Sequence, residues 1–283
     1  ACAGGRKTSS DCRERGFYNP AVTAPFLNIA TYRFVPLADL PALRQRLFDT
    51  AQAHGVRGTV LLAEEGINLC LAGPAGGIGA WLAVARAQPG LDGLPTKDSW
   101  STTQPFGRLK VKIKPEIIRM NMPGVVHDVR PAAGRAPAVS AATLARWITQ
   151  GHCDAGRPLA LLDTRNGFEV DAGAFDGAID WRLQKFSDFP AAVAVHRDAL
   201  AGHTVVSYCT GGIRCEKAAL VLQDLGVPHA LQLEGGILKY FEDTGGAAPG
   251  WRGSCFVFDD RVALAPSLTP SPAPAPIPAD QPA

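Results

Sequence analysis

The stretch Val205-Val-Ser-Tyr-Cys-Thr-Gly-Gly-Ile-Arg-Cys-Glu-Lys-Ala218 decides the fold of the second half of this chain. Its apolar start, residues 204–208, predicts a short buried strand. The apolar spacing over residues 218–225 predicts a helix that ends at Gly226. A cysteine and two glycines lie at the junction. A strand that joins a helix through a glycine-rich turn is how α/β proteins place a nucleophile or an anion site.

Cys209 stands at this junction, and its setting predicts a reactive thiolate. Consecutive glycines allow positive φ, so several backbone N–H groups can point toward the sulfur. Those N–H groups, the N-terminus of the following helix and the charge of Arg214 all favour a thiolate over a thiol. The alternative is a small buried hydrophobic cysteine, which would need neither the glycines nor the arginine. We therefore expect Cys209 to be the catalytic residue.

The segment Tyr208-Cys-Thr-Gly-Gly-Ile-Arg214 resembles the active-site loop of the rhodanese superfamily, in which a cysteine opens a six-residue loop and carries a persulfide. Residues 159–169 with 173–179 resemble the superfamily's DxRxxxE and G-H-x-x-G-A motifs, and residues 233–237 resemble its L-x-G-G turn. Ala174 stands where many members have histidine, so the role of that histidine is not carried over. The resemblance implies an active-site loop made of Cys209, Thr210, Gly211, Gly212, Ile213 and Arg214.

Two longer strings point to a narrower family. Residues 209–218, together with Leu61-Leu-Ala-Glu-Glu-Gly-Ile-Asn68, are similar to the rhodanese-domain tRNA uridine hydroxylases, oxidoreductases that hydroxylate the wobble uridine of certain bacterial tRNAs at C5. The resemblance covers roughly residues 24–262. It implies an α/β rhodanese-like domain with a parallel sheet, preceded by an α+β ferredoxin-like (acylphosphatase-like) domain. It also implies tRNA, bound through its anticodon loop, as the partner, with O2 and an electron donor as co-reactants.

Length and composition agree with this architecture. A chain of 283 residues predicts two domains, and 46% hydrophobic residues suffice for buried cores. The net charge is only +2, so affinity for a nucleic acid must come from a local patch. Seven irregularly spaced cysteines indicate a reducing compartment. No apolar run approaches the length of a membrane span, so we expect a cytoplasmic protein whose partners include neither membrane nor DNA.

Changes in composition divide the chain. Glycine, proline and small polar residues mark the N-terminal tail and a linker between the domains. Proline, alanine and serine repeats indicate an extended C-terminal tail. The predicted parts are a disordered tail over 1–22, a ferredoxin-like domain over 23–122, a linker over 123–138, a rhodanese domain over 139–246, a segment packing on the body over 247–265, and a disordered tail over 266–283.

The first domain shows the order β-α-β-β-α-β, which is typical of a ferredoxin-like sandwich. Asp39 is the expected N-cap of its first helix, with Pro41 in the first turn and Gly55 after the end. The predicted elements are a strand at 26–34, a helix at 36–53, strands at 57–63 and 68–71, a helix at 76–87 and a strand at 109–114.

The last of these strands is strongly basic. Its charge has two interpretations: a solubilising face that protects a sheet edge, or a track for RNA phosphates. The spacing alone favours the solubilising face. With the resemblance to tRNA enzymes, the solubilising face and the RNA track are about equally supported. The candidate RNA-binding residues are Lys110, Lys112, Lys114 and Arg119, with Arg108 beside them.

Three polar or thiol side chains are candidates for supporting roles. Asp163 and Arg165 follow an apolar strand at its carboxyl end, where open α/β sheets place their chemistry, but they could equally form a structural ion pair. Cys215 could resolve a persulfide or sulfenate on Cys209 as a disulfide, or it could be a small buried helix residue. The turn at residues 64–68 could face substrate or only reverse the chain.

The sequence does not explain how oxygen is activated. It shows no flavin, haem or two-His-one-carboxylate signature, and its histidines are scattered, so we expect no bound cofactor and no metal site. Hydroxylation of tRNA is the first functional hypothesis. A sulfurtransferase that passes persulfide sulfur from Cys209 is the second, and a non-enzymatic interaction module is the third. A phosphatase is disfavoured because Arg214 follows Cys209 by five positions, which gives a tighter loop than the Cys-x5-Arg cradle of phosphate.

Overall fold

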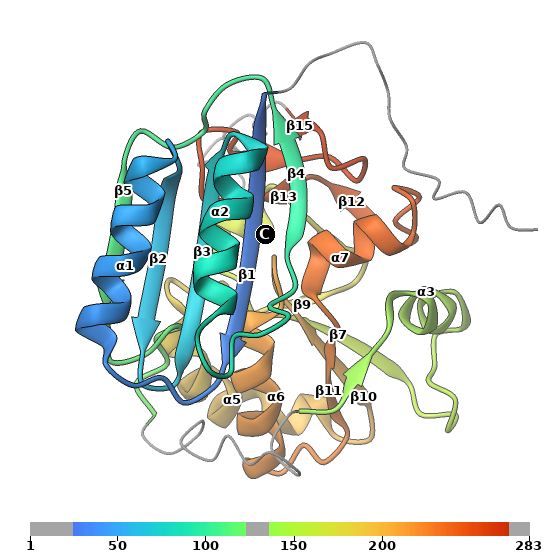
Figure 1. Cartoon of the computed structure of the whole chain (residues 1–283). Helices are drawn as coiled ribbons and strands as arrows, with labels where there is room; N and C mark the ends of the chain where they lie inside the picture. Colours follow the sequence, from blue (N-terminus) through green and yellow to red (C-terminus); the bar gives the residue numbers. More distant parts are fainter. Residues whose placement is uncertain (1–24, 123–135, 272–283) are drawn as a thin grey trace, which may run out of the picture.

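The computed structural model describes residues 25–122 and 136–271, which form two sheets with their helices (Figure 1). The N-terminal tail expected over 1–22, the linker residues 123–135 and the C-terminal residues from 272 onward lie outside the described residues. No helix in the described ranges is long and apolar enough to cross a membrane.

The first sheet belongs to the N-terminal part of the chain and carries two helices on one face (Figure 1). Asp39 caps the first helix by accepting a hydrogen bond from the N–H of Ala42, as expected from sequence. Leu47 and Trp81 lie in the core between helices and sheet, where Trp81 Nε1 donates to the carbonyl of Leu47 at 3.0 Å. The elements are β1 (Phe26–Phe34), α1 (Leu40–Ala53), β2 (Arg57–Ala63), β3 (Gly66–Gly73), α2 (Ala75–Arg86), β4 (Lys97–Ser101) and β5 (Leu109–Ile113).

The strand order of the first sheet, β4-β1-β3-β2-β5, corrects one expectation. The fourth strand of the ferredoxin-like unit is β4, which pairs antiparallel with β1, whereas the basic strand β5 is an additional strand parallel to β2 at the opposite edge. The sequence Lys-Asp-Ser-Trp-Ser of β4 does not alternate apolar and polar residues. An edge strand whose residues are partly exposed can form without such alternation. The sequence therefore gave no sign of this strand.

The second sheet is entirely parallel, as expected, with the order β6-β11-β10-β7-β9. Its central strand β10 is buried at every residue, and three of its five residues, Val205, Val206 and Tyr208, are apolar or aromatic. The strands are β6 (Ala138–Val139), β7 (Leu159–Asp163), β9 (Ile179–Asp180), β10 (Thr204–Tyr208) and β11 (Ala230–Leu233), and the helices are α3 (Ala141–Gln150), α4 (Gly167–Val170), α5 (Phe189–His196), α6 (Ile213–Asp224) and α7 (Gly236–Asp243).

The chain after α7 folds back over both parts of the molecule. Strand β12 (Trp251–Gly253) pairs with β8 (Gly173–Phe175), and β13 (Cys255–Phe256), β14 (Ala263–Leu264) and β15 (Pro270–Ser271) form a small antiparallel sheet. The sequence predicts that the C-terminal tail begins at residue 266. This boundary is too early, because Pro270–Ser271 form β15. Leu268 packs against the core of the second domain and Ala265 N–H bonds to the carbonyl of Thr269, so these contacts outweigh the proline-rich composition.

A buried ion cluster joins the two domains. Lys217 in α6 is 2% exposed, and its ammonium lies 3.1 Å from Glu65 and 2.8 Å from Glu116 of the first domain. Nearby, Tyr32 of β1 donates a hydrogen bond to Glu216 at 3.2 Å. Glu65 in the turn before β3 thus docks the two domains together. These contacts hold the open face of the first sheet against the helix that begins at the Cys209 loop.

Candidate active site

The Cys209 loop lies between the carboxyl end of β10 and the first turn of α6, as the sequence predicts. Gly212 has a φ of 96°, which turns its N–H toward the sulfur, and this N–H donates to Cys209 Sγ at 3.1 Å. Helix α7 supports the loop from behind, because Ile237 N–H bonds to the carbonyl of Cys209 at 3.0 Å. A Cβ on Gly236 would lie 2.4 Å from that same carbonyl oxygen, so the second glycine of the L-x-G-G turn is required by close packing.

The surroundings of Cys209 favour the thiolate. Burial raises the pKa of its thiol, but a hydrogen bond from the Cys215 thiol, the charge of Arg214 and the N–H groups of Arg214 and Gly212 outweigh burial and lower the pKa from 9.0 to about 6. The pKa of Cys215 is raised well above its usual value by burial and by the neighbouring Cys209. Cys215 is therefore a neutral thiol donor to a charged Cys209.

The guanidinium of Arg214 is held by a carboxylate behind the loop. It donates to both oxygens of Glu169, at 2.9 and 2.8 Å, and Glu169 is fully buried. Arg214 thus has a fixed position, and its charge is largely balanced by Glu169. Its contribution to the thiolate comes from its backbone N–H as well as from its charge.

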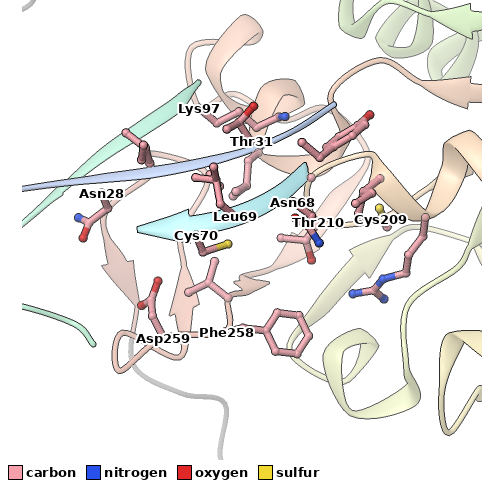
Figure 2. A pocket seen from close by; sticks show the side chains of 18 of the residues that line it. Asn28, Thr31, Asn68, Leu69, Cys70, Lys97, Cys209, Thr210, Phe258 and Asp259 are labelled. Carbon is pink, nitrogen blue, oxygen red and sulfur yellow. The ribbon is translucent and has the colours of Figure 1, made fainter. Parts of the chain in front are cut away.

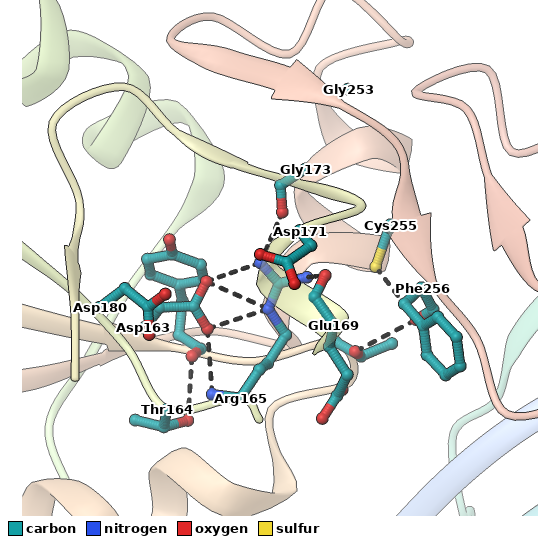
Figure 3. A network of polar contacts seen from close by, with 12 residues as sticks. Asp163, Thr164, Arg165, Glu169, Asp171, Gly173, Asp180, Gly253, Cys255 and Phe256 are labelled. Atoms are coloured by element: carbon teal, nitrogen blue, oxygen red, sulfur yellow. Dashed lines mark hydrogen bonds and ion pairs between the residues drawn. The ribbon is translucent and has the colours of Figure 1, made fainter. Parts of the chain in front are cut away.

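Asp163 and Arg165 form a buried structural pair (Figure 3). Arg165 is fully buried, and its guanidinium lies 2.6 Å from Asp163 Oδ2 and also donates to the carbonyls of Glu169 and Gly173. These bonds lock the segment that carries Glu169. Of the two interpretations from sequence, this arrangement agrees with a structural ion pair.

Cys209 lies at the floor of a cavity of about 480 Å³ whose walls come from both domains (Figure 2). The first domain presents the sheet face that its helices leave open, and the ladder row Lys97–Ala30–Cys70 runs across that face. The wall residues that sequence reasoning missed include Asn28, Tyr32, Cys70, Lys97 and Asn166, whereas Asn68 belongs to the turn for which contact with substrate was one of the two interpretations. Except for Asn166, which precedes α4 in the second domain, they belong to the first domain, so only the docking of the two domains identifies them.

Lys97 is the notable cation of this cavity. It is half-buried, and it makes no ion pair with any residue in the described ranges; its ammonium lies 5.5 Å from the centre of the Tyr32 ring. Burial lowers the pKa of Lys97, while the nearby Cys209 and Cys70 thiols oppose that shift. A thiolate and a lysine without an ion pair among the described residues thus face one cavity, where the charge of Glu242 also raises the pKa of Lys97.

The candidate RNA-binding residues occupy different positions. Arg119 lines the Cys209 cavity, and Lys110 lines a second cavity of about 490 Å³ beside it. Lys112 and Lys114 are exposed and line neither of these cavities. Strand β5 is the edge strand that the solubilising interpretation requires.

The described part of the chain holds free thiols and no set of side chains arranged as metal ligands. Cys70, Cys153, Cys209, Cys215 and Cys255 are all free cysteines. Within residues 25–122 and 136–271, no group of three or more His, Cys, Asp or Glu side chains is arranged to hold a metal ion. The reactive group that this geometry provides is the Cys209 sulfur.

Comparison with known proteins agrees with both domains. Residues 26–117 match the family described as UPF0176 acylphosphatase like domain, and residues 140–243 match the Rhodanese-like domain, which confirms the expected fold class. The chain is 58% identical over 243 residues to the tRNA uridine(34) hydroxylase of Variovorax paradoxus (86% of this chain, 90% of the relative). It is 60% identical over 242 residues to that of Bordetella petrii (86% and 94%) and 57% identical over 242 residues to that of Bordetella avium (86% and 98%). With this identity over most of both chains, the protein belongs to the tRNA uridine(34) hydroxylase family.

Proposed function

We propose that this protein is an oxidoreductase that hydroxylates the wobble uridine of tRNA at C5, with Cys209 as its catalytic residue. The observation that carries the proposal is a cysteine with a pKa of about 6 at the floor of a cavity built by both domains. The names of its relatives supply the substrate. The anticodon loop is the part of tRNA that holds this uridine, and the base must leave its stack to reach a buried sulfur.

The cavity wall offers partners for the polar edge of a uracil. Uracil has two carbonyl oxygens and one N–H group between them. Lys97 supplies a cation for a carbonyl oxygen, and the buried Oδ1 of Asn166 has no hydrogen-bond partner among the described residues and can accept from an N–H group. The volume of about 480 Å³ is in the range of small-molecule sites.

The thiolate can activate C5 of the base. Uracil is an α,β-unsaturated carbonyl compound, so addition of the Cys209 sulfur to C6 moves the electron pair of the C5–C6 double bond onto C5 and O4. Lys97 stabilises the negative charge on O4. C5 can then take one oxygen atom from a reduced dioxygen species, after which loss of the C5 proton and departure of the thiolate restore the ring. The balance is one O2, two electrons from a donor and two protons consumed, with one water released.

The cytoplasm is the compartment in which we place this activity. Both tRNA and free thiols are found there, and the described residues contain five free cysteines.

Nucleoside analysis of tRNA tests the proposal. Cells that lack the gene should lose 5-hydroxyuridine and the nucleosides derived from it. Wild-type protein should restore them, and Cys209→Ser should not. A matched variant, Cys255→Ser, alters a buried free thiol outside the cavity and should restore them.

The second candidate function is sulfur transfer, because the Rhodanese-like match and the Cys209 sulfur that accepts from the Gly212 N–H also suit a persulfide. Unchanged tRNA nucleosides in the deletion strain, combined with rapid thiosulfate cleavage that depends on Cys209, would replace hydroxylation with sulfur transfer.

A further inference from the structure

Three phenylalanines form an exposed aromatic surface, here called the Phe cluster. Phe168 in α4 and Phe258 after β13 are 51% and 58% exposed. Both pack edge-to-face on Phe256, with ring centroids 5.2 and 5.1 Å away. Exposed aromatic rings that adjoin one another are characteristic of a binding surface, whereas single exposed apolar residues are ordinary.

The Phe cluster lies at the Cys209 cavity. Thr210, the residue after the catalytic cysteine, donates a hydrogen bond to the carbonyl of Phe256 at 3.4 Å. Phe258 lines the cavity itself (Figure 2). Asn166, two residues before Phe168, lines it as well. A molecule whose reacting group enters the cavity would therefore bring its adjoining parts to the Phe cluster.

A basic groove leads away from the Phe cluster. The second cavity shares Phe106, Phe258 and Asp259 with the Cys209 cavity, and it continues past Arg108 and Lys110. Asp259 is neutralised by Arg261, whose guanidinium lies 2.6 Å away. Asp260 also lines the groove, so within the described part of the chain the charges without an ion pair there are Arg108, Lys110 and Asp260, which leaves a net positive charge.

We propose that the Phe cluster stacks the bases that flank the wobble uridine, and that the groove past Arg108 and Lys110 takes the RNA backbone. This proposal rests on the proposed function and adds the surface that binds the rest of the anticodon loop. When one base leaves the loop stack, its neighbours lose stacking area, and aromatic side chains replace it. Exposed rings beside a basic groove are the combination by which proteins bind single-stranded nucleic acid.

Binding of an RNA hairpin to the full-length protein tests the surface. The probe is a fluorescent anticodon stem-loop RNA with uridine at the wobble position, and the same stem closed by a minimal loop is its reference. Phe168→Leu and Phe258→Leu keep apolar volume but lose the aromatic face. Each should weaken binding of the stem-loop about tenfold, since stacking of one base on an aromatic ring contributes roughly 1–3 kcal/mol. Phe258→Trp should bind as the wild type does.

Two matched controls separate this surface from general effects. Trp100 is as exposed as Phe168, but it pairs with Leu27 on the helix-covered side of the first sheet, so Trp100→Leu should leave binding unchanged. Lys110→Glu should lower the salt dependence of binding by about 0.7 per lost phosphate contact. Lys112→Glu, which changes a lysine outside both cavities, should lower it less.

The outcomes distinguish this surface from the function itself. Wild-type protein that binds the stem-loop but does not hydroxylate it would refute the proposed function and leave the Phe cluster in place. Hydroxylating protein whose two leucine variants bind the stem-loop as the wild type does would refute the Phe cluster alone. If those variants bound RNA normally but lost activity, the Phe cluster would not act in RNA binding and its proposal would fail, and if the wild type did not bind the stem-loop, both proposals would fail.

Discussion

At the scale of single residues, hydrogen-bond donors that carry no charge stabilise the thiolate form of Cys209. The cation nearest in sequence, Arg214, is bound to Glu169 by two hydrogen bonds. The N–H of Gly212 and the thiol of Cys215 bond to the sulfur directly. A thiolate held in this way is not locked in an ion pair, so it keeps its nucleophilic lone pairs for a substrate.

Replacement of Lys97 tests the electrostatic part of the mechanism. Lys97→Met should lower kcat for hydroxylation of a stem-loop RNA about 100-fold, because removal of one group that stabilises a developing oxyanion costs on the order of 100- to 1,000-fold. The dissociation constant of the RNA should change much less. Steady-state kinetics and binding measured on the same RNA separate the two effects.

The control for Lys97 is Lys239→Met. Lys239 pairs with Asp243 on α7 and does not line the Cys209 cavity, so its loss should leave kcat within about twofold. Equal losses for the two variants would mean that Lys97 has no special role at the reacting base.

Cys209 could be predicted from sequence, and Lys97 could not. The evidence for Cys209 is local, since the strand, the two glycines and the helix are adjacent in the chain. Lys97 reaches the cavity only because β4 pairs with β1 and because the second domain covers that face of the sheet. The residues next to Lys97 in sequence indicate neither the pairing of β4 with β1 nor the position of the second domain.

At the scale of elements, helix α6 has two tasks. Its first turn carries the loop that holds Cys209, and one residue further on Lys217 joins the helix to the first domain through Glu65 and Glu116. A shift of one element relative to the other would therefore change the cavity. The turn at residues 64–68, which could face substrate or only reverse the chain, places Glu65 in this ion cluster and Asn68 in the wall of the Cys209 cavity.

Removal of Lys217 should destabilise the protein strongly. Lys217→Met leaves Glu65 and Glu116 close together without their cation, and breaking a buried ion pair costs about 3–5 kcal/mol. Urea unfolding of the full chain measures this change. Lys239→Met, which removes an exposed i,i+4 pair, should cost about 0.5 kcal/mol or less.

The pH dependence of stability gives a second readout of the same cluster. Burial opposes ionisation of Glu116, but hydrogen bonds from Lys217 and from the N–H groups of Met120 and Asn121 lower its pKa below 4.5. An acid whose pKa is lowered by folding stabilises the native state above its unfolded pKa, and that stability is lost as the pH falls through the native pKa. The wild type should lose this stability below about pH 4.5, and Lys217→Met should lose less, whereas equal acid sensitivity would exclude Lys217 as the cause.

The sequence predicted the strands that are buried and missed the one that is not. Strand β10 is mostly apolar because both faces are covered, so its pattern is unambiguous. In strand β4, polar residues that are buried or half-buried alternate with the exposed Asp98 and Trp100, so its pattern does not predict a strand, and the sequence assigns the fourth strand of the unit to β5 instead. Edge strands depend on tertiary pairing, which local pattern does not encode.

At the scale of the whole molecule, the site exists only between the domains. The second domain supplies the nucleophile and the first supplies the opposite wall with Lys97, while the C-terminal segment adds Phe258 at the opening. The sequence predicted both folds and the nucleophile, because each rests on a contiguous motif. It could not predict the cavity, since that depends on the contact between two sheets whose residues are far apart in the chain.

The rate of alkylation of Cys209 as a function of pH tests the central claim most directly. In the full chain, iodoacetamide should modify Cys209 with a midpoint near pH 6 and reach a plateau by about pH 7, because a thiol with that pKa is about nine-tenths ionised there. Cys255, whose pKa burial raises to about 12, is the internal control and should stay unmodified. Peptide mass spectrometry that instead found Cys209 unreactive at neutral pH, or reactive only above about pH 9, would contradict the account.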